Sequence, residues 1–251
     1  MFNHFWQFRK RGETPVDEKT QIVTFLGIPF NLSNIISGTV AAILVFCLVF
    51  WLSRNIQMKP SGRQNLLEWI IDFTNGIVKS AIPDEAGKSY GLLAFTLFVF
   101  IFVANQLGLA IEVSYNDYNF MKSPTSMPMT TMTLAFIVFL LAHYMGVKKF
   151  GFKGYFVNTF MSPMKALLPI NILEQFTNFI TLALRLYGNI FAGEILLTLI
   201  YKLAKINAFV FIPASVLELI WQGFSVFIGS IQAFVFTTLT MVYISQKIEK
   251  E

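Results

Sequence analysis

The stretch LALRLYGNIFAGE at residues 182–194 decides the fold, and it lies inside a long apolar helical pattern, Ile172–Tyr201. A single arginine, Arg185, stands near the middle of this pattern. A guanidinium group stays protonated at any ordinary pH, so it cannot become neutral to enter a membrane. Charged groups at membrane depth are costly and mark ion pathways or buried partners. Arg185 therefore indicates one of these two roles.

The composition indicates an integral membrane protein. Of 251 residues, 55% are hydrophobic and 13% are charged, whereas soluble domains carry about 25% charged residues. The net charge of +5 is modest. The basic residues lie in loops without the interleaved aromatics of a nucleic-acid binder, so we expect contact with membrane lipid and none with nucleic acid. The single cysteine, Cys47, and the two distant histidines offer no metal spacing, and we expect no cofactor.

The apolar segments divide the chain into a single polytopic membrane domain, residues 1–251. A polar tail, residues 1–33, precedes them. The expected spans are residues 34–53, 90–111 and 127–147, followed by two longer segments, 168–202 and 208–246.

Residues 64–82 differ from these spans because they alternate apolar and polar residues with helical spacing. This pattern predicts an amphipathic helix lying on the membrane surface. The expected apolar face consists of Leu66, Ile70, Phe73, Ile77 and Ala81, and the opposite face of Glu68, Asp72, Asn75 and Lys79.

The last two segments are too long to cross a membrane upright. At about 1.5 Å per residue, residues 168–202 extend roughly 52 Å and residues 208–246 roughly 58 Å, whereas the hydrocarbon core is about 30 Å thick. We therefore predict an all-α integral membrane protein with three near-perpendicular spans, one amphipathic surface helix, and a hairpin of two long, strongly tilted helices. The alternative is that these helices break at glycines, for which the candidates are Gly188, Gly193, Gly223 and Gly229.

Lysines in the loops predict the orientation. The loop at residues 148–165 contains four lysines and no acidic residue, which places it in the cytoplasm. The N-terminus is then external and the C-terminus cytoplasmic. The cluster Arg9-Lys10-Arg11 opposes this assignment, because it would lie outside.

Each of the two long segments carries a polar stripe along one helical face. The first stripe consists of Glu174, Asn178, Thr181, Arg185 and Asn189; the second of Glu218, Gln222, Ser225, Gly229 and Gln232. Glu194 points to the face opposite Arg185. Because lipid would leave such groups unsatisfied, we expect the stripes to face each other or water.

These stripes have two interpretations. They could be interhelical hydrogen bonds and an Arg–Glu pair that hold a bundle together, with Glu174 and Glu194 reaching the membrane interface. They could also form an ion path, because buried carboxylates titrate near neutrality and can relay protons. The permanent charge of Arg185 would block such a path, so ions would cross only on a moving carrier.

The motif LRLYGN at residues 184–189, followed by AGE at 192–194, resembles the signature of subunit a of bacterial F-type ATP synthases. The run IQAFVF beginning at Ile231 and the SPTS motif at residues 123–126 are similar to the same family, and the resemblance extends from about residue 60 to the end. It implies a non-catalytic stator in the bacterial cell membrane. Two offset half-channels would carry protons or sodium ions to and from carboxylates of the c-subunit ring. The implied partners are that ring, the peripheral-stalk b subunits and the remainder of the ATP synthase.

The resemblance also implies roles for individual residues. Arg185 would separate the half-channels, with Asn189 and Gln232 as its polar neighbours. Glu194 would belong to the external half-channel and Glu174 to the cytoplasmic one. The remaining polar stripe residues are candidates for lining the path: Asn178, Thr181, Glu218, Gln222 and Ser225.

The chain departs from the family pattern at two places. Ser225 occupies a position where the family often has a histidine that pairs with the Glu194 position. Met127 and Met129 stand where related sequences often place Asp and Asn. No Glu–His relay is therefore expected here.

Two other protein classes remain as alternatives. In a free-standing secondary transporter or channel, Arg185 would bind an anionic substrate, and internal repeats would be expected; we find none. In a purely structural scaffold, lysine would replace Arg185 without effect. The sequence contains no G-x-x-x-x-G-K-[ST] loop for nucleotide binding, so we expect no catalysis by this chain alone.

Overall fold

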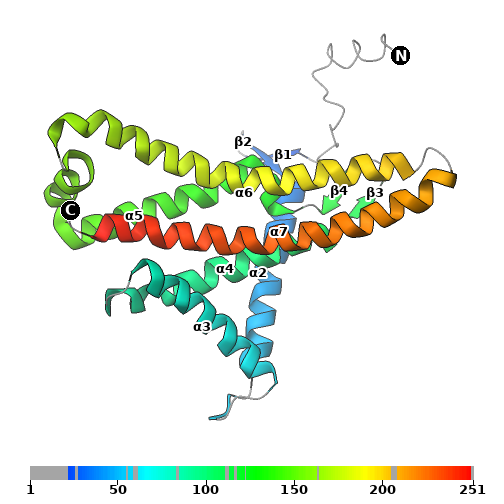
Figure 1. Cartoon of the computed structure of the whole chain (residues 1–251), viewed down its shortest axis with the longest axis horizontal. Coiled ribbons are helices and arrows are strands. Elements are labelled where there is room, and N and C mark those ends of the chain that lie inside the picture. The colour runs from blue at the N-terminus through cyan, green and yellow to red at the C-terminus, as the bar shows by residue number, and fades with distance from the viewer. Residues whose placement is uncertain are drawn as a thin grey trace, which may run out of the picture.

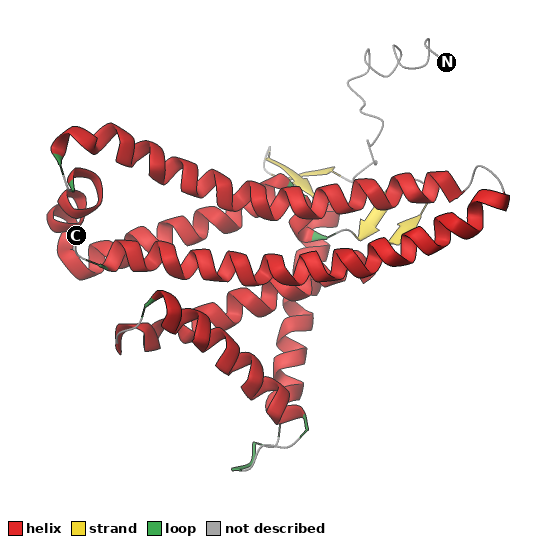
Figure 2. Cartoon of the chain, in the orientation of Figure 1, coloured by secondary structure: helices red, strands yellow, loops and turns green. Residues whose placement is uncertain are grey.

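The computed structural model describes residues 22–25, 28–54, 56–58, 62–82, 85–110, 113–115, 118–121, 123–162, 164–204 and 208–249. Helices make up nearly all of this (Figures 1 and 2), as the sequence predicted. The long helices are α2 (Leu32–Ser53), α3 (Arg63–Ala81), α4 (Gly91–Ala110), α5 (Pro128–Phe156), α6 (Leu168–Ala204) and α7 (Ala208–Ile248). The first 21 residues of the expected polar tail lie outside the described residues.

Short elements connect the helices. They are the 3-10 turns η1 (Glu85–Tyr90), η2 (Pro124–Ser126) and η4 (Lys165–Leu167), and the π-helical turn η3 (Val157–Met161). Two small antiparallel strand pairs, which the sequence did not predict, join β1 (Ile22–Phe25) to β2 (Ile28–Asn31) and β3 (Val113–Tyr115) to β4 (Tyr118–Met121).

Among the described residues, five helices are long and apolar enough to cross a membrane: α2, α4, α5, α6 and α7. Helix α3 is not one of them, which agrees with the predicted surface helix. Ile77 of the predicted apolar face is buried, whereas Leu66 and Phe73 of that face are exposed. Leu67 and Val78, which the prediction did not include, are also buried, because α3 packs against α4.

Helix α7 is the central element, and α4, α5 and α6 pack along it (Figure 1). Near its C-terminal end, Met241 and Ile244 belong to one buried cluster with Ala94 of α4 and Ala142 of α5. Further toward its N-terminus, Phe236 packs in a second cluster that includes residues of α4, α5 and α6. Helices α6 and α7 run through their glycines as continuous helices of 37 and 41 residues. The alternative of helices broken at these glycines is therefore wrong.

The helices do not all run in one direction. Figure 1 shows α4 and α5 running in the general direction of α7, whereas α2 runs across it. Three near-perpendicular spans and a tilted hairpin stay a prediction as regards the membrane, because packing against neighbouring helices sets the tilt of each span.

Helix α5 contains a reversal that the sequence analysis missed. Gly151 has φ +70°, in the left-handed region that glycine adopts without steric cost. Beyond it the chain folds back, and the ring of Tyr155 packs on Gly146, where an added Cβ would lie 2.6 Å from the Tyr155 ring. The predicted end of this span at residue 147 thus lies just before the turn.

The SPTS motif docks tightly on α4. The Thr125 hydroxyl donates to Asn105 Oδ1 at 2.7 Å, and Asn105 Nδ2 donates to the Gly229 carbonyl of α7 at 3.0 Å. Asn105 is fully buried. A Cβ added at Gly108 would overlap the Cβ of Ser123. Gly108 thereby allows the contact through which this turn reaches both α4 and α7.

Gly108→Ala should destabilise the chain by about 1–3 kcal/mol, the usual cost of overpacking a close contact. The backbone of Ser123 would have to move, and this would strain the buried hydrogen bonds of Thr125 and Asn105. The measurement is the thermal stability of the purified complex in detergent. The matched control is Gly76→Ala in α3, where an added Cβ meets no atom within 4 Å. Equal stability of the two variants would contradict the packing described here.

Candidate ion-translocation site

The polar stripe of α6 points away from the bundle to which the helix belongs. Glu174, Thr181, Arg185 and Asn189 are exposed, and Asn178 is half-buried. The opposite face of the helix contributes Leu182, Ala183 and Leu186 to the buried core. The amphipathic pattern of α6 is thus the reverse of that in a channel enclosed by one chain, because the charged face lies outside.

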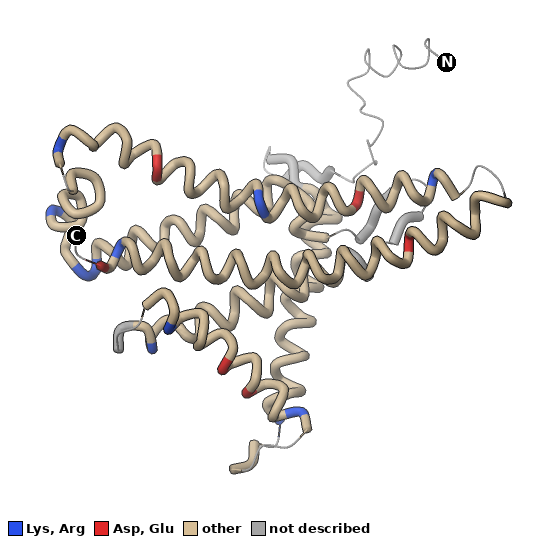
Figure 3. Tube along the Cα trace, viewed as in Figure 1, with Lys and Arg blue, Asp and Glu red and all other residues tan. Residues whose placement is uncertain are grey.

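Apolar side chains surround this outer stripe. Leu184, adjacent to Arg185, is 48% exposed, and other exposed apolar residues of α6 include Leu173, Phe176, Leu196 and Leu199. Figure 3 shows how few charged residues lie along α6 and α7. Against lipid, a guanidinium in such a surface would be costly. The mixture of apolar side chains and one arginine on this face therefore suits contact with a partner that carries a polar or charged group.

The two polar stripes meet at one point. Asn189 Nδ2 donates to Gln232 Oε1 at 2.8 Å, and Gln232 is 2% exposed. This pair joins α6 to α7 one helical turn beyond Arg185. The expectation that the stripes face each other holds at this pair, whereas the rest of the α6 stripe is turned outward.

A cavity of about 180 Å³ lies between α6 and α7 on the C-terminal side of Arg185. Its polar lining includes Asn189, Trp221 and Ser225. Ser225 is 7% exposed, and its hydroxyl oxygen is buried without a hydrogen-bond partner among the described residues. The cavity is large enough for several waters, since about 10–15 Å³ of accessible volume is enough to hold one water. It is a polar space in which Ser225 can hydrogen-bond to water.

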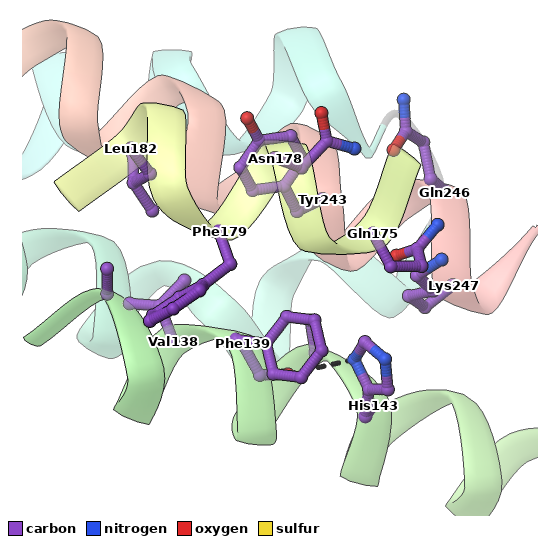
Figure 4. Close-up of a pocket in the computed structure, with 12 residues that line it drawn as sticks. Val138, Phe139, His143, Gln175, Asn178, Phe179, Leu182, Tyr243, Gln246 and Lys247 are labelled. Atoms are coloured by element: carbon purple, nitrogen blue, oxygen red, sulfur yellow. Dashed lines mark hydrogen bonds between the residues drawn. The ribbon is translucent and has the colours of Figure 1, made fainter. Parts of the chain in front are cut away.

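A second, smaller cavity of about 20 Å³ lies on the N-terminal side of Arg185, between α5, α6 and α7. Figure 4 shows its polar lining, which consists of His143, Gln175, Asn178, Tyr243, Gln246 and Lys247. Its size fits about one water. Tyr243 links this cavity to Arg185, because the Tyr243 hydroxyl lies within electrostatic reach of the guanidinium group.

Sequence reasoning missed His143 and Tyr243 at this place. His143 Nδ1 lies 3.0 Å from the Phe139 carbonyl, and its ring centroid lies 4.0 Å from that of Phe139. The available signal was a histidine within the otherwise apolar span 127–147. Which helix it faces depends on the packing of three helices and could not be inferred from that one segment.

The predicted acidic residues are distributed as follows. Glu174 is exposed, and its neighbour Gln175, together with Asn178, lines the smaller cavity. Glu194 is half-buried directly after Gly193, which lines the larger cavity. In α7, Glu218 is half-buried and Gln222 is exposed. The structure therefore brings together Asn189, Gln232 and Ser225 near Arg185, while Glu174, Glu218 and Gln222 stand apart from that group.

The sequence model of the family described as ATP synthase A chain matches residues 35–245. The chain belongs to this family. It is 56% identical to ATP synthase subunit a of Pediococcus pentosaceus over 238 residues, which cover 93% of this chain and 99% of the relative. It is 49% identical to the Listeria monocytogenes protein of that name over 237 residues, 94% and 100% of the two chains. The corresponding Enterococcus hirae protein is 54% identical over 211 residues, 83% and 88% of the two chains.

Membership of the ATP synthase A chain family confirms several expectations from the sequence. The chain is a non-catalytic subunit of the membrane Fo sector, where it serves ion transport and ATP synthesis. It is a multi-pass membrane protein of the bacterial type, with a stator role rather than that of a free-standing transporter. The outward-facing Arg185 therefore belongs to a chain that assembles with the rest of an F-type ATP synthase.

Proposed function

We propose that this chain forms two offset half-channels that carry protons or sodium ions to and from carboxylates on a ring of c subunits, with Arg185 between them. The observation that carries the proposal is the exposure of Arg185 on the outer, apolar face of α6. A free-standing transporter would bind its substrate within its own bundle. An outward arginine at membrane depth instead suits a partner that brings a carboxylate past it.

The two cavities support the division into half-channels. One is lined by Asn178 of α6 and the other by Asn189, on either side of Arg185. Eleven residues separate these asparagines, which is about 16 Å along a helix. The cavities are therefore offset along α6 instead of forming one continuous passage, and ions would have to travel on the ring between them.

Electrostatics explains what Arg185 would do in this place. At an effective dielectric constant of about 20, opposite unit charges 4 Å apart attract by roughly 4 kcal/mol. One pKa unit corresponds to about 1.4 kcal/mol. Arg185 would therefore hold a passing ring carboxylate ionised and favour release of its ion. The same charge would repel a cation that tried to cross directly from one cavity to the other.

The remaining roles follow from the same arrangement. The larger cavity, next to Glu194, would belong to the external half-channel, and Glu174 and Asn178 to the cytoplasmic one. Thr181 would line the ring-facing surface between them. This assignment requires the N-terminus to be external and the C-terminus cytoplasmic, as the loop lysines predict. The b subunits of the peripheral stalk and the remainder of the ATP synthase are the further partners that family membership implies.

Arg185→Ala should abolish coupled pumping while the complex still assembles, because Arg185 lies on the exposed face of α6, outside the buried core of this chain. Arg185→Lys should also pump poorly, since a lysine can lose its proton when buried and presents a more compact charge. The measurement is ATP-driven ion uptake into inverted membrane vesicles, with co-purification of the complex as the control for assembly. A normal pumping rate in an assembled Arg185→Ala complex would refute the proposed function.

Ser225→Val and Ser225→Thr form a matched pair of nearly equal volume that differs in the hydroxyl group. If Ser225 binds water in the larger cavity, the valine variant should slow pumping by roughly threefold to tenfold, the effect of losing about one hydrogen bond. The threonine variant should stay close to the wild-type rate. Both are measured in the same vesicles at equal amounts of assembled complex. Equal rates for the two variants would show that the hydroxyl has no role in transport.

The orientation can be tested with single cysteines introduced into a Cys47→Ser background. A cysteine at Lys153 should react with a membrane-impermeant thiol reagent only from the cytoplasmic side, and a cysteine at Asn116 only from outside. Labelling of right-side-out and inverted vesicles gives the comparison. The opposite pattern would exchange the roles proposed for Glu174 and Glu194.

A further inference from the structure

We infer that the segment at residues 148–165 is a preformed docking surface for anionic phospholipid headgroups. Its outer face presents Lys149, Lys153, Phe152 and Phe156, and we refer to these four residues as the basic aromatic face. All four are exposed, and the two phenylalanines are 76% and 41% exposed. This proposal is independent of the half-channels, because none of these residues lines either cavity described above.

Hydrogen bonds and packing hold this segment against the rest of the bundle. The ring of Tyr155 is buried on Gly146, and Asn158 Nδ2 donates to the Glu249 carbonyl at 3.0 Å. Asn171 Nδ2 of α6 donates to the carbonyl oxygens of Phe160 and Ser162 at 3.1 and 3.0 Å. The inner side of the segment is therefore fixed to α5, α6 and α7.

This attachment determines what the outer side presents. Tyr155 points inward, so Phe152 and Phe156, four residues apart, share the outward face of the short helical turn. Lys149 lies beside the turn, with its ammonium group 5.8 Å from the centroid of Phe150. The chain reverses at Gly151, which turns the residues after it toward the surface. A Cβ added at Gly151 would meet no other atom within 4 Å.

The chemistry of the basic aromatic face favours lipid over a protein partner. Residues 148–165 contain four lysines, all exposed, and no acidic residue. Figure 3 shows the basic residues gathered at this end of the bundle. Lysines near a membrane surface attract anionic lipids, and phenylalanine side chains beside them can bury at the boundary between headgroups and acyl chains. Lysine is a point charge without the bidentate geometry of arginine, which suits a laterally mobile anionic surface better than one fixed carboxylate.

The wild-type complex provides the first test. We would reconstitute it in phosphatidylcholine vesicles containing trace photoreactive lipid, either phosphatidylglycerol or phosphatidylcholine with the same reactive group. Cross-links from the phosphatidylglycerol probe should concentrate in the peptide at residues 148–165, exceed those from the phosphatidylcholine probe, and decrease with salt. Equal labelling by both probes would overturn the proposal. Absence of labelling of this peptide by both probes would show that another subunit covers the face, and it would also overturn the proposal.

Variants supply the second test. Lys149→Gln with Lys153→Gln should reduce phosphatidylglycerol labelling about tenfold or more, because each lysine contributes about fivefold in affinity near an anionic surface. The control is Lys202→Gln, which removes an exposed lysine at the other end of α6 and should leave labelling of the 148–165 peptide unchanged. Pumping by the double variant separates the two proposals. Loss of phosphatidylglycerol labelling with normal pumping would support the lipid proposal and leave the half-channel proposal unaffected. Unchanged labelling in the double variant would overturn only the lipid proposal.

Discussion

A guanidinium that cannot lose its proton has to meet water or a counter-charge when it stands in a membrane. The architecture of this chain follows from that constraint. Helix α6 buries Leu182, Ala183 and Leu186 against its own bundle and thereby turns Arg185 outward. The guanidinium of Arg185 is thus left accessible to another molecule. The proposed function requires this exposure, because a charge enclosed within the bundle could not reach a carboxylate on a moving partner.

The central helix α7 relates the two cavities to each other. Ser225 lines the larger cavity, Tyr243 lines the smaller one, and Gln232 lies between them in sequence and binds Asn189. Because α7 is one continuous helix, the separation of these three groups is fixed by its rise per residue. Helices α4 and α5 hold it in place through buried clusters and through the bond from Asn105 to the Gly229 carbonyl. The packing of these helices therefore fixes the positions of the two cavities relative to each other and to Arg185.

The sequence was sufficient for the features that repeat along one helix. The lengths of α6 and α7, the gathering of polar residues into one stripe around Arg185 and the amphipathic pattern of α3 all follow from periodicity and from the thickness of the membrane. The direction of the stripe does not, because the sequence predicted that it faces the stripe of α7 or water, whereas Arg185 is exposed and Asn189 meets Gln232. Features that depend on contacts between helices were not predictable in this way. The directions of α4 and α5, the set of buried α3 residues and the position of His143 in the smaller cavity with Tyr243 arise from packing. Gly151 gave no signal of its reversal, because a glycine near the end of an apolar segment is equally compatible with a regular helix.

The two cavities differ in chemistry as well as in size. The larger one is lined by the Ser225 hydroxyl and the Asn189 amide, neither of which changes its charge near neutral pH. In the proposed external half-channel Glu194 is then the titratable side chain, and transfer from it to the ring has to proceed through water in the cavity. A carboxylate paired with histidine would instead pass a proton between two side chains. In the proposed half-channel the cavity of about 180 Å³ gives room for such water, because the small side chain of Ser225 leaves a gap that solvent can bridge.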